Sequence, residues 1–424
     1  MKTVSIDSPE FLTKRQTPTL LDRLARRLVE RRLSSIEKGQ ITLIENGREK
    51  TFGSIVGEFP VSVVVKVNSP AFYSDIAFGG SVGSGEAYIQ GYWECSEVEA
   101  LVQILLRNRG VLDELDSGAA LLKRPVQKLF HWLNRNTRRG SRKNIAAHYD
   151  LGNDFYKLWL DAQMMYSSAF FPSATTSLDE AAIAKLERIC QKLDLKASDT
   201  VIEIGTGWGG FAIYAASRYG CHVTTTTISE QQYDYAKSKV NALGMADRIT
   251  LLKHDYRDLE GQFDKLVSIE MIEAVGHEYL DTFFEKCASL LKPEGEMLIQ
   301  AITIGDQQYE KAKKTVDFIK RYVFPGGFLP SLTAMTNSLT RVTQLRAIGV
   351  EDIGPHYALT LKHWRERFFD KLADVRRQGF SDEFIRMWEF YLCYCEGAFV
   401  ERAIGTVQLH AIGADARPAA ISGG

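Results

Sequence analysis

The stretch Thr200–Ala216, TVIEIGTGWGGFAIYAA, contains residues whose types and spacing suit a cofactor site. An apolar run contains Glu203, and four glycines then follow within six positions before a helical pattern begins. Glycine lets the backbone approach a ligand closely, but the GxGxxG match of Gly205, Gly207 and Gly210 alone is a weak signal. A dinucleotide site also needs an acid about 20 residues later. The next predicted strand instead ends in TTTTISEQQ.

A second candidate for chemistry is Glu273, in the segment EMIEAVG. It follows the apolar run 263–269, which is typical of a buried strand. A carboxyl group at that place would be desolvated, and its pKa would be perturbed unless it were paired. The structural alternative is an acid that caps the next helix.

The elements that must position these residues begin at about residue 177, where Ser177 and Glu180 match a capping box. Apolar, strand-like runs then alternate with helical patterns. The runs are TVIEIG, HVTTTTI, ITLLKHD, FDKLVSI and EMLIQAITI. This alternation predicts an α/β fold, a doubly wound, Rossmann-like parallel sheet with helices on both faces. Ligands of such sheets bind beyond the carboxyl ends of the strands, where the glycine turn falls.

Residues 1–125 form a predicted smaller α+β domain with a different pattern. A helix is expected over 22–32, a hairpin at Asn46–Gly47, and strands over 61–67 and 72–80. The predicted apolar side of the helix consists of Leu21, Leu24, Leu28 and Val29.

The bulk composition excludes several classes of protein. A net charge of −1 over 424 residues is not that of a nucleic-acid binder. The six cysteines form no CxxC pair and have no histidine at metal spacing, so no metal site is expected. No signal peptide and no apolar run of the ~20 residues that a membrane span needs is present. We therefore expect a cytoplasmic protein.

Several motifs together identify a family. EIGTGWGG resembles the first motif of S-adenosylmethionine-dependent methyltransferases. Six other stretches resemble the cyclopropane-fatty-acyl-phospholipid synthases over about residues 80 to 410. These stretches are GEAYIQGYWEC, HYDLGNDFYKLWLD with MMYSSAFF, TISEQQYDYA, EMIEAVG, FPGGFLPS, and GPHYALTLKHWRERF with MWEFYLCYCEGAF. The resemblance implies that the methyl group goes to the cis double bond of an unsaturated acyl chain in a membrane phospholipid.

In this family the base is a bound bicarbonate, held by a Glu, a Tyr, a His and backbone groups. By position, the resemblance implies Glu273, Tyr357 and the backbone of Ile302. Ser168 stands where the best-known relatives have Cys, and Gln300 where many have His. Serine should be tolerated if this position acts through its backbone. Glutamine can hydrogen-bond an anion but cannot titrate.

These two departures leave the fate of the cation open. A cyclopropane, a methylene or methyl-branched chain, or a furan precursor could follow. Cys395 in LCYCEGAF matches a cysteine proposed as catalytic in the family, and a buried structural thiol is the alternative. A non-catalytic lipid-binding relative and a small-molecule methyltransferase are the competing functions.

The resemblance also implies a set of cofactor contacts. Gln232 could replace the missing ribose acid, whereas Trp208 could equally be core packing. The set comprises Tyr166, Ser167, Val201, Ile202, Glu203, Ile204, Gly205, Thr206, Gly207, Trp208, Gly209, Thr227, Gln232, Tyr256 and Arg257.

Four segments follow from these patterns: a lipid-binding domain over 1–125, a basic connector over 126–144, a methyltransferase domain over 145–410 and a flexible tail over 411–424. The connector is either a solvated linker or a site for anionic headgroups, which would hold the enzyme peripherally at the inner face of the membrane. Its basic residues are Arg135, Arg138, Arg139, Arg142 and Lys143. A homodimer is expected by family analogy only.

Overall fold

The chain divides into two compact units, each described here by itself. The structure is a computed structural model that describes residues 17–55, 57–111 and 151–417. Unit 1 spans 1–130, 316–323 and 372–403, and unit 2 spans 131–315, 324–371 and 404–424. Two segments inside the predicted domain over 145–410, namely residues 316–323 and 372–403, group with unit 1. The basic connector lies outside the described residues.

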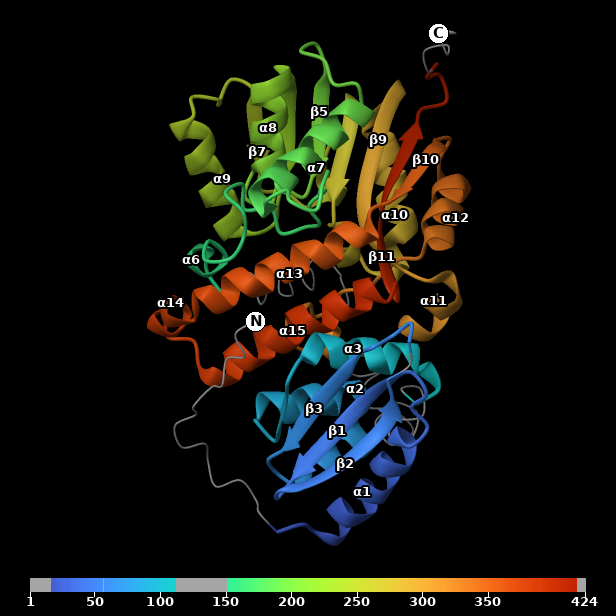
Figure 1. Cartoon of the computed structure of the whole chain (residues 1–424). Helices are drawn as coiled ribbons and strands as arrows, with labels where there is room; N and C mark the ends of the chain where they lie inside the picture. Colours follow the sequence, from blue (N-terminus) through green and yellow to red (C-terminus); the bar gives the residue numbers. More distant parts are fainter. Residues whose placement is uncertain (1–16, 56, 112–150, 418–424) are drawn as a thin grey trace. The chain divides into compact units, whose positions relative to one another are not determined.

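Unit 2 is built on a seven-stranded sheet of order β10-β11-β9-β8-β5-β6-β7 (Figure 1). The pairs from β7 to β9 are parallel, and β11 pairs antiparallel with β9 and β10. Its strands are β5 (Thr200–Ile204), β6 (His222–Thr226), β7 (Ile249–Leu252), β8 (Phe263–Ile269), β9 (Leu291–Ile304), β10 (Arg346–Asp352) and β11 (Ile404–Ile412). Its α-helices are α6 (Asn153–Tyr156), α7 (Leu178–Lys192), α8 (Gly210–Tyr219), α9 (Glu230–Ala242), α10 (Leu280–Ser289), α11 (Asp306–Ala312), α12 (Leu332–Val342) and α13 (Gly354–Asp370). Short 3₁₀ turns are η1 (Tyr256–Asp258), η2 (Ile272–Ala274) and η3 (His277–Tyr279).

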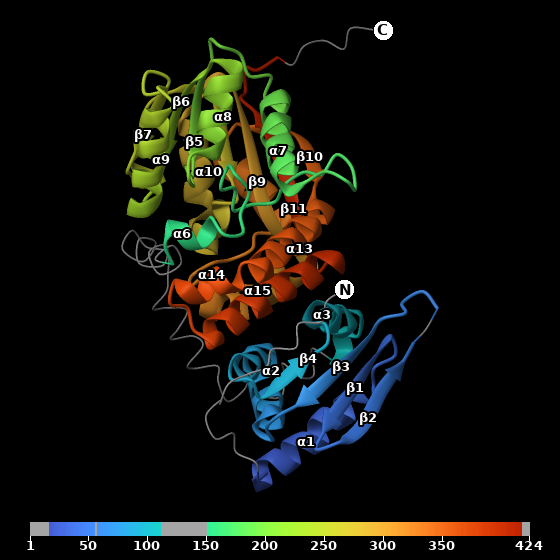
Figure 2. The ribbon, with the colours of Figure 1, turned by 60° about the vertical axis from the view of Figure 1, so that its left-hand side comes forward.

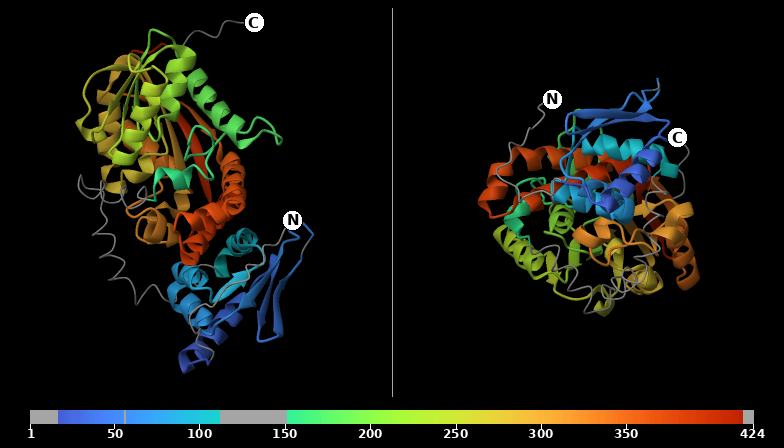
Figure 3. Two further views of the ribbon diagram at one scale, coloured as in Figure 1. Left: turned by 90° about the vertical axis from the view of Figure 1, so that its left-hand side faces the viewer. Right: turned by 90° about the horizontal axis from the view of Figure 1, so that it is seen from below.

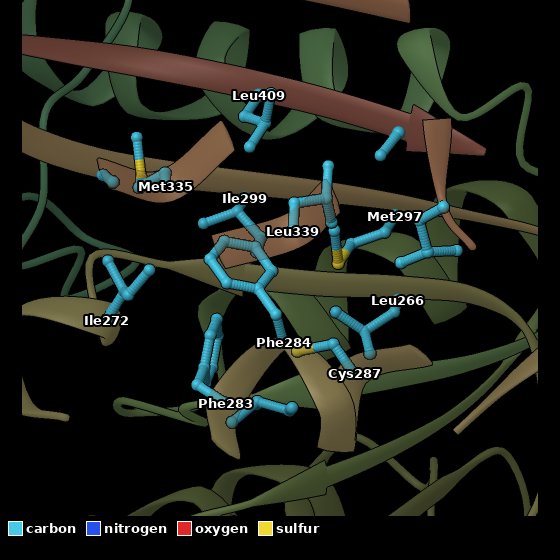
Figure 4. Packing of buried hydrophobic residues seen from close by; sticks show 14 of the residues in the cluster. Leu266, Ile272, Phe283, Phe284, Cys287, Met297, Ile299, Met335, Leu339 and Leu409 are labelled. Carbon is cyan, nitrogen blue, oxygen red and sulfur yellow. The ribbon is translucent and has the colours of Figure 1, made fainter. Parts of the chain in front are cut away.

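The sheet buries both of its faces, which confirms the predicted doubly wound α/β fold. Val201 packs with α7, α8 and α9, whereas Ile202 packs with α10 and α12, because successive side chains of a strand point to opposite faces. Figure 2 shows α7, α8, α9 and α10 around the sheet, and Figure 1 labels α12. Figure 4 shows the second face, where Phe284 of α10 lies beside Ile299 of β9, and Phe283 and Met297 belong to the same cluster. This core fixes the strands whose carboxyl ends bear the site.

The predicted tail begins too early. Residues 410–412 lie inside β11, drawn in red in Figures 1 and 3, and this strand forms ladders with β9 and β10. Leu409 and Ala411 are completely buried. This strand was not predicted because it is stabilised by pairing with two strands that are distant in sequence, and its own residue pattern does not indicate a strand.

Unit 1 contains a four-stranded sheet of order β2-β1-β3-β4. The predicted hairpin is confirmed, since Asn46 and Gly47 both have positive φ in a two-residue turn. Its elements are α1 (Leu20–Leu33), β1 (Gly39–Glu45), β2 (Arg48–Ser54), β3 (Ser62–Val67), α2 (Ala71–Ile89), β4 (Trp93–Cys95), α3 (Val98–Arg107), the π-helix η4 (Ile319–Val323), α14 (Leu372–Arg377) and α15 (Asp382–Val400).

The strand predicted over 72–80 is wrong, because this segment lies in α2. The helix is kinked at Gly80, where φ is 57° and ψ is −142°. A Cβ atom at Gly83 would lie 2.0 Å from the carbonyl oxygen of Asp75, so the glycines permit the kink and the close packing behind it. Tertiary packing here overrides the strand-like aromatic pattern.

The late segment α15 joins unit 1 through a buried arginine. Arg386 donates to the carbonyl oxygens of Tyr88 at 2.6 Å and Trp93 at 2.8 Å. At Gly397 there is no room for a side chain, since a Cβ atom would lie 2.9 Å from the carbonyl oxygen of Glu99. Two of the family-like stretches, GEAYIQGYWEC and MWEFYLCYCEGAF, therefore form one folded unit.

Helix α1 divides the predicted apolar side, because Val29 is buried whereas the leucines turn outward. Ala25, Val29 and Leu33 are buried together with the capping residue Asp22. The leucines Leu20, Leu21, Leu24 and Leu28 are instead 77%, 53%, 57% and 43% exposed. Among the described residues, α1 thus carries an uncovered apolar stripe, which we call the α1 leucine face.

Candidate active site

The catalytic candidates of unit 2 meet at the carboxyl end of β8. Strand β8 ends at Ile269, which pairs with Gln300 of β9. Their positions are as follows: Glu273 is in η2, Gln300 and Ile302 are on β9, Tyr357 is on α13, and Ser168 precedes α7. The residue next to Ile269 is Glu270, which the sequence interpretation did not single out.

The carboxylate of Glu270 gathers three of the predicted catalytic groups. Its Oε1 atom accepts hydrogen bonds from the backbone N–H of Ser168 at 2.9 Å and from Nε2 of Gln300 at 2.8 Å. Its Oε2 atom accepts from the hydroxyl of Tyr357 at 2.8 Å. Ser168 thus donates through its backbone and Gln300 through its side-chain amide, while their catalytic roles stay a prediction. The anion that they hold is a side chain of the protein itself.

A second row of hydrogen bonds fixes the orientation of Gln300. Nε2 of Gln408 donates to Oε1 of Gln300 at 3.0 Å, and Nζ of Lys192 donates to Oε1 of Gln408 at 2.7 Å. With its oxygen already accepting, Gln300 presents its NH₂ group to Glu270. The row therefore assigns the amide orientation and keeps a donor directed at the carboxylate.

Glu273 lies beside Glu270 but accepts fewer of the hydrogen bonds that stabilise a negative charge. Its Oε1 atom accepts from the backbone N–H of Ile302, whereas its buried Oε2 atom has no hydrogen-bond partner among the described residues. Burial, followed by the charge of Glu270, raises the pKa of Glu273 to about 8. Burial also raises the pKa of Glu270, but the donors on Gln300, Ser168 and Tyr357 oppose that shift. Two adjacent carboxylates do not both ionise readily, and the three donors on Glu270 favour the negative charge there rather than on Glu273.

One buried lysine supplies positive charge to this region. Lys185 of α7 is completely buried, and its Nζ atom donates to Oγ of Ser167 at 2.9 Å. Burial lowers the pKa of Lys185 to about 8, and attraction to Glu270, Asp161 and Glu203 opposes that shift. Lys185 thereby links the catalytic carboxylates electrostatically to the strand that bears Glu203.

The glycine turn between β5 and α8 is shaped to admit a ligand. Gly205, Gly207 and Gly209 have φ values of 106°, 52° and 86°, which favour glycine. A Cβ atom at Gly207 would meet no atom of the described residues within 4 Å. Helix α8 begins after Gly209 without a side-chain cap, so its first amides are free of a capping side chain.

Glu203 is engaged within the sheet. Its Oε2 atom accepts from Oγ1 of Thr225 at 2.6 Å, and Oγ1 of Thr206 lies 2.7 Å from the same hydroxyl. Burial raises the pKa of Glu203 to about 8. Its predicted role toward a cationic amine remains a prediction. The neighbours Val201, Ile202 and Ile204 are buried strand residues.

The other cofactor candidates surround the same strand ends. Oγ1 of Thr227 donates to Oε1 of Gln232 at 2.9 Å. The hydroxyl of Tyr256 is buried and has no hydrogen-bond partner in the described part of the chain. Arg257 pairs with Asp255 at 2.6 Å. An orphaned hydroxyl, open space at Gly207 and an uncapped helix start together fit a bound cofactor.

An aromatic wall connects the cofactor side to the catalytic side. The ring of Tyr166 lies 5.5 Å from Tyr156 and 5.3 Å from Trp364, and Trp364 lies 5.9 Å from Tyr357. Trp208 packs 5.0 Å from Tyr156 and donates to Asn153 at 2.7 Å, so it takes part in packing. Aromatic faces stabilise positive charge without offering a nucleophile.

Cys395 belongs to unit 1, on α15. Burial raises the pKa of its thiol, which disfavours the thiolate that a nucleophile or base would require. This position therefore supports the structural alternative for Cys395.

Comparisons with known proteins agree with this geometry. The sequence profile described as Mycolic acid cyclopropane synthetase matches residues 136–409. The chain is 38% identical over 329 residues to the tuberculostearic acid methyltransferase UfaA1 of Mycobacterium tuberculosis, covering 76% of each protein. It is 36% identical over 353 residues to the cyclopropane-fatty-acyl-phospholipid synthase of Escherichia coli, covering 83% of this chain and 87% of that protein.

Solved structures show the same similarity. The cyclopropane synthase MmaA2 from Mycobacterium tuberculosis superimposes with a TM-score of 0.60 at 27% identity, covering 64% of this chain and 98% of that one. The mycolic acid cyclopropane synthase CmaA1, complexed with SAH and CTAB, superimposes with a TM-score of 0.60 at 28% identity and the same coverage.

Proposed function

The chain belongs to the mycolic acid cyclopropane synthetase family, and on this premise we propose that it converts cis double bonds of unsaturated acyl chains in membrane phospholipids into cyclopropanes. It is an S-adenosylmethionine-dependent methyltransferase of the cyclopropane synthase type. The observation that carries the proposal is the cluster of three donors on Glu270, joined by an aromatic wall to the open glycine turn.

The geometry suits a reaction that passes through a carbocation. When bound, S-adenosylmethionine supplies an electrophilic methyl group. The residues that fit it are the glycine turn, Gln232 and Tyr256, through open backbone and free polar groups. The wall from Tyr156 to Trp364 would present aromatic faces to a developing cation. The polar cluster around Glu270 then provides the negative charge needed where a proton must leave.

A second product class is favoured by a specific observation. Gln300 cannot titrate, and the relative with 38% identity is named a tuberculostearic acid methyltransferase. The alternative is therefore a C-methyltransferase that makes methylene- or methyl-branched chains, or a furan precursor. A non-catalytic lipid-binding relative is a weaker alternative, because the glycine turn and the carboxyl cluster are intact.

Labelled S-adenosylmethionine and oleoyl phospholipid vesicles test the proposal directly. We expect label in the acyl chains, with the mass of the chain increased by one CH₂ group and ring protons visible by NMR. Ozonolysis separates a ring, which resists cleavage, from a methylene product. Cofactor binding without transfer would favour the non-catalytic alternative, and transfer only to a water-soluble acceptor would contradict the substrate class.

We also propose that the enzyme docks on anionic membranes through the α1 leucine face. No helix in the described part of the chain is long and apolar enough to cross a membrane. The arginines Arg23, Arg27 and Arg31 are exposed beside the exposed leucines. An interfacial helix combines such an apolar stripe with basic residues, each worth about 1 kcal/mol near anionic lipid. The basic connector would add to the same attraction.

The double substitution Leu24→Asp, Leu28→Asp should weaken binding to anionic vesicles at least about tenfold, since two partly inserted side chains are lost and two like charges are added. Vesicle co-sedimentation measures this. The matched control is Val64→Asp, which removes an apolar side chain that is 41% exposed on β3. Equal binding of the double variant and this control would contradict the docking site.

Light scattering of the protein without vesicles tests the expected homodimer.

A further inference from the structure

The groups expected to hold bicarbonate are already used by the chain's own carboxylates. The N–H of Ser168, the amide of Gln300 and the hydroxyl of Tyr357 all donate to Glu270. The N–H of Ile302 donates to Glu273. A bicarbonate ion would have to displace Glu270 and then lie against its negative charge, so this site does not fit the ion.

The backbone at Glu270 supports a positional role for its side chain. Its φ is 50°, in the left-handed region that a non-glycine residue adopts only at a cost. The conformation is fixed by the N–H of Glu270, which donates to the carbonyl oxygen of Gln300 at 2.8 Å. This arrangement aims the carboxylate at three donors that come from three different parts of the chain.

We propose that the carboxylate of Glu270 is the proton acceptor of the reaction and that the enzyme needs no bicarbonate. The inference rests on the proposed methyl transfer. The alkene electron pair forms the new bond to the methyl carbon, and the C–S electron pair stays on sulfur. A C–H bond of the transferred methyl group then gives its electron pair to close the ring onto the cationic carbon. The released proton goes to an oxygen of Glu270.

The neighbouring groups support this assignment. Glu273 carries a proton at neutral pH, so it adds no second negative charge beside Glu270. Lys185 lies close enough for its charge to stabilise the ionised form of Glu270. A methylene product would require the same acceptor, because its final step is also the loss of one proton.

Two substitutions separate Glu270 from a bicarbonate base. Glu270→Gly removes the carboxylate, leaves three donors vacant and suits a φ of 50°. Glu270→Gln removes the base but fills the same space. Without dissolved carbon dioxide, the native enzyme should keep its turnover within about twofold, whereas both variants should lose at least about 100-fold, the size of a general-base effect. Millimolar bicarbonate or formate should restore the glycine variant at least about tenfold and leave the glutamine variant inactive.

Binding measurements give a readout that does not depend on turnover. Isotopically labelled bicarbonate should show NMR line broadening with Glu270→Gly and none with the native protein, while calorimetry should show unchanged S-adenosylmethionine affinity for all three. Native turnover that falls when carbon dioxide is removed, or a glycine variant fully active without any anion, would overturn the assignment. Failure of the proposed function has a different signature, since the native enzyme would then transfer no methyl group with or without bicarbonate.

Discussion

Replacement of Lys185 by methionine is expected to lower the free energy of unfolding by about 3–5 kcal/mol, the usual effect of removing one partner from a buried group of charges. Lys185 is completely buried, and its charge lowers the pKa of Glu270, Glu203 and Asp161. Methionine fills a similar volume, so the loss is mainly electrostatic. Without the ammonium group, Ser167 also loses the donor to its hydroxyl, beside the backbone that holds Glu270. Chemical denaturation measures the change.

The effect should depend on pH with a definite sign. In the folded protein the pKa of Glu203 is raised to about 8, so folding takes up a proton at neutral pH and stability falls as the pH rises toward 8. The variant should raise the carboxyl pKa values further, which makes its destabilisation larger at about pH 8 than at about pH 6. Lys362→Met, at an exposed position of α13, is the control and should change stability by less than about 0.5 kcal/mol. A Lys185 variant as stable as this control at both pH values would contradict the electrostatic role.

The parallel part of the sheet could be predicted because its information is local. Runs such as Thr200–Ile204 and Phe263–Ile269 are short, apolar and followed by helical patterns. Each βα unit can therefore be recognised from its local sequence. Strands β10 and β11 cannot be recognised in this way, because they form by pairing: β11 pairs with β9, and β10 pairs with β11. The assignment of α15 to unit 1 likewise depends on Arg386, which bonds carbonyls 298 and 293 residues away. No local pattern contains such contacts.

The candidate site was predicted in its members but not in its organisation. Family-like motifs located Ser168, Gln300 and Tyr357, but their common acceptor was missed although it opens the quoted stretch EMIEAVG. These donors lie 102, 30 and 87 residues from Glu270 along the chain. A sequence-level signal does exist, namely a second acid three residues before Glu273, directly after a buried strand. This spacing indicates a pair of carboxylates, but only the fold shows that Glu270 is the one that accepts the three hydrogen bonds.

The same distinction applies to α1. The heptad-like leucines correctly predict a helix, but they do not show which side faces the core. In the structure Ala25 and Val29 pack inward, and their small size permits the close approach of α1 to α2. The larger leucines remain exposed, where the proposed membrane surface would cover them. A helix whose larger apolar side faces outward has the arrangement that the proposed membrane docking requires.

Substitution of Gly207 by valine is expected to weaken S-adenosylmethionine binding by at least about 100-fold, equivalent to about 2.7 kcal/mol. The φ value of 52° is unfavourable for a β-branched residue, and a side chain would enter the space left open beside the turn. If the cofactor approaches the backbone there, the added carbon atoms exclude it. Calorimetric titration with S-adenosylmethionine, and with its demethylated product, measures the loss directly.

The control for backbone strain is Gly244→Val. Gly244 has a φ of 65°, and a Cβ atom there would also meet none of the described atoms within 4 Å. It follows α9 at an exposed position away from the turn. Both variants should lose a similar amount of stability, about 1–2 kcal/mol, because both force a side chain into the left-handed region. Only the Gly207 variant should lose cofactor affinity. If both bind the cofactor equally well, the glycine turn serves only the fold, and the cofactor must be held without a close backbone approach at Gly207.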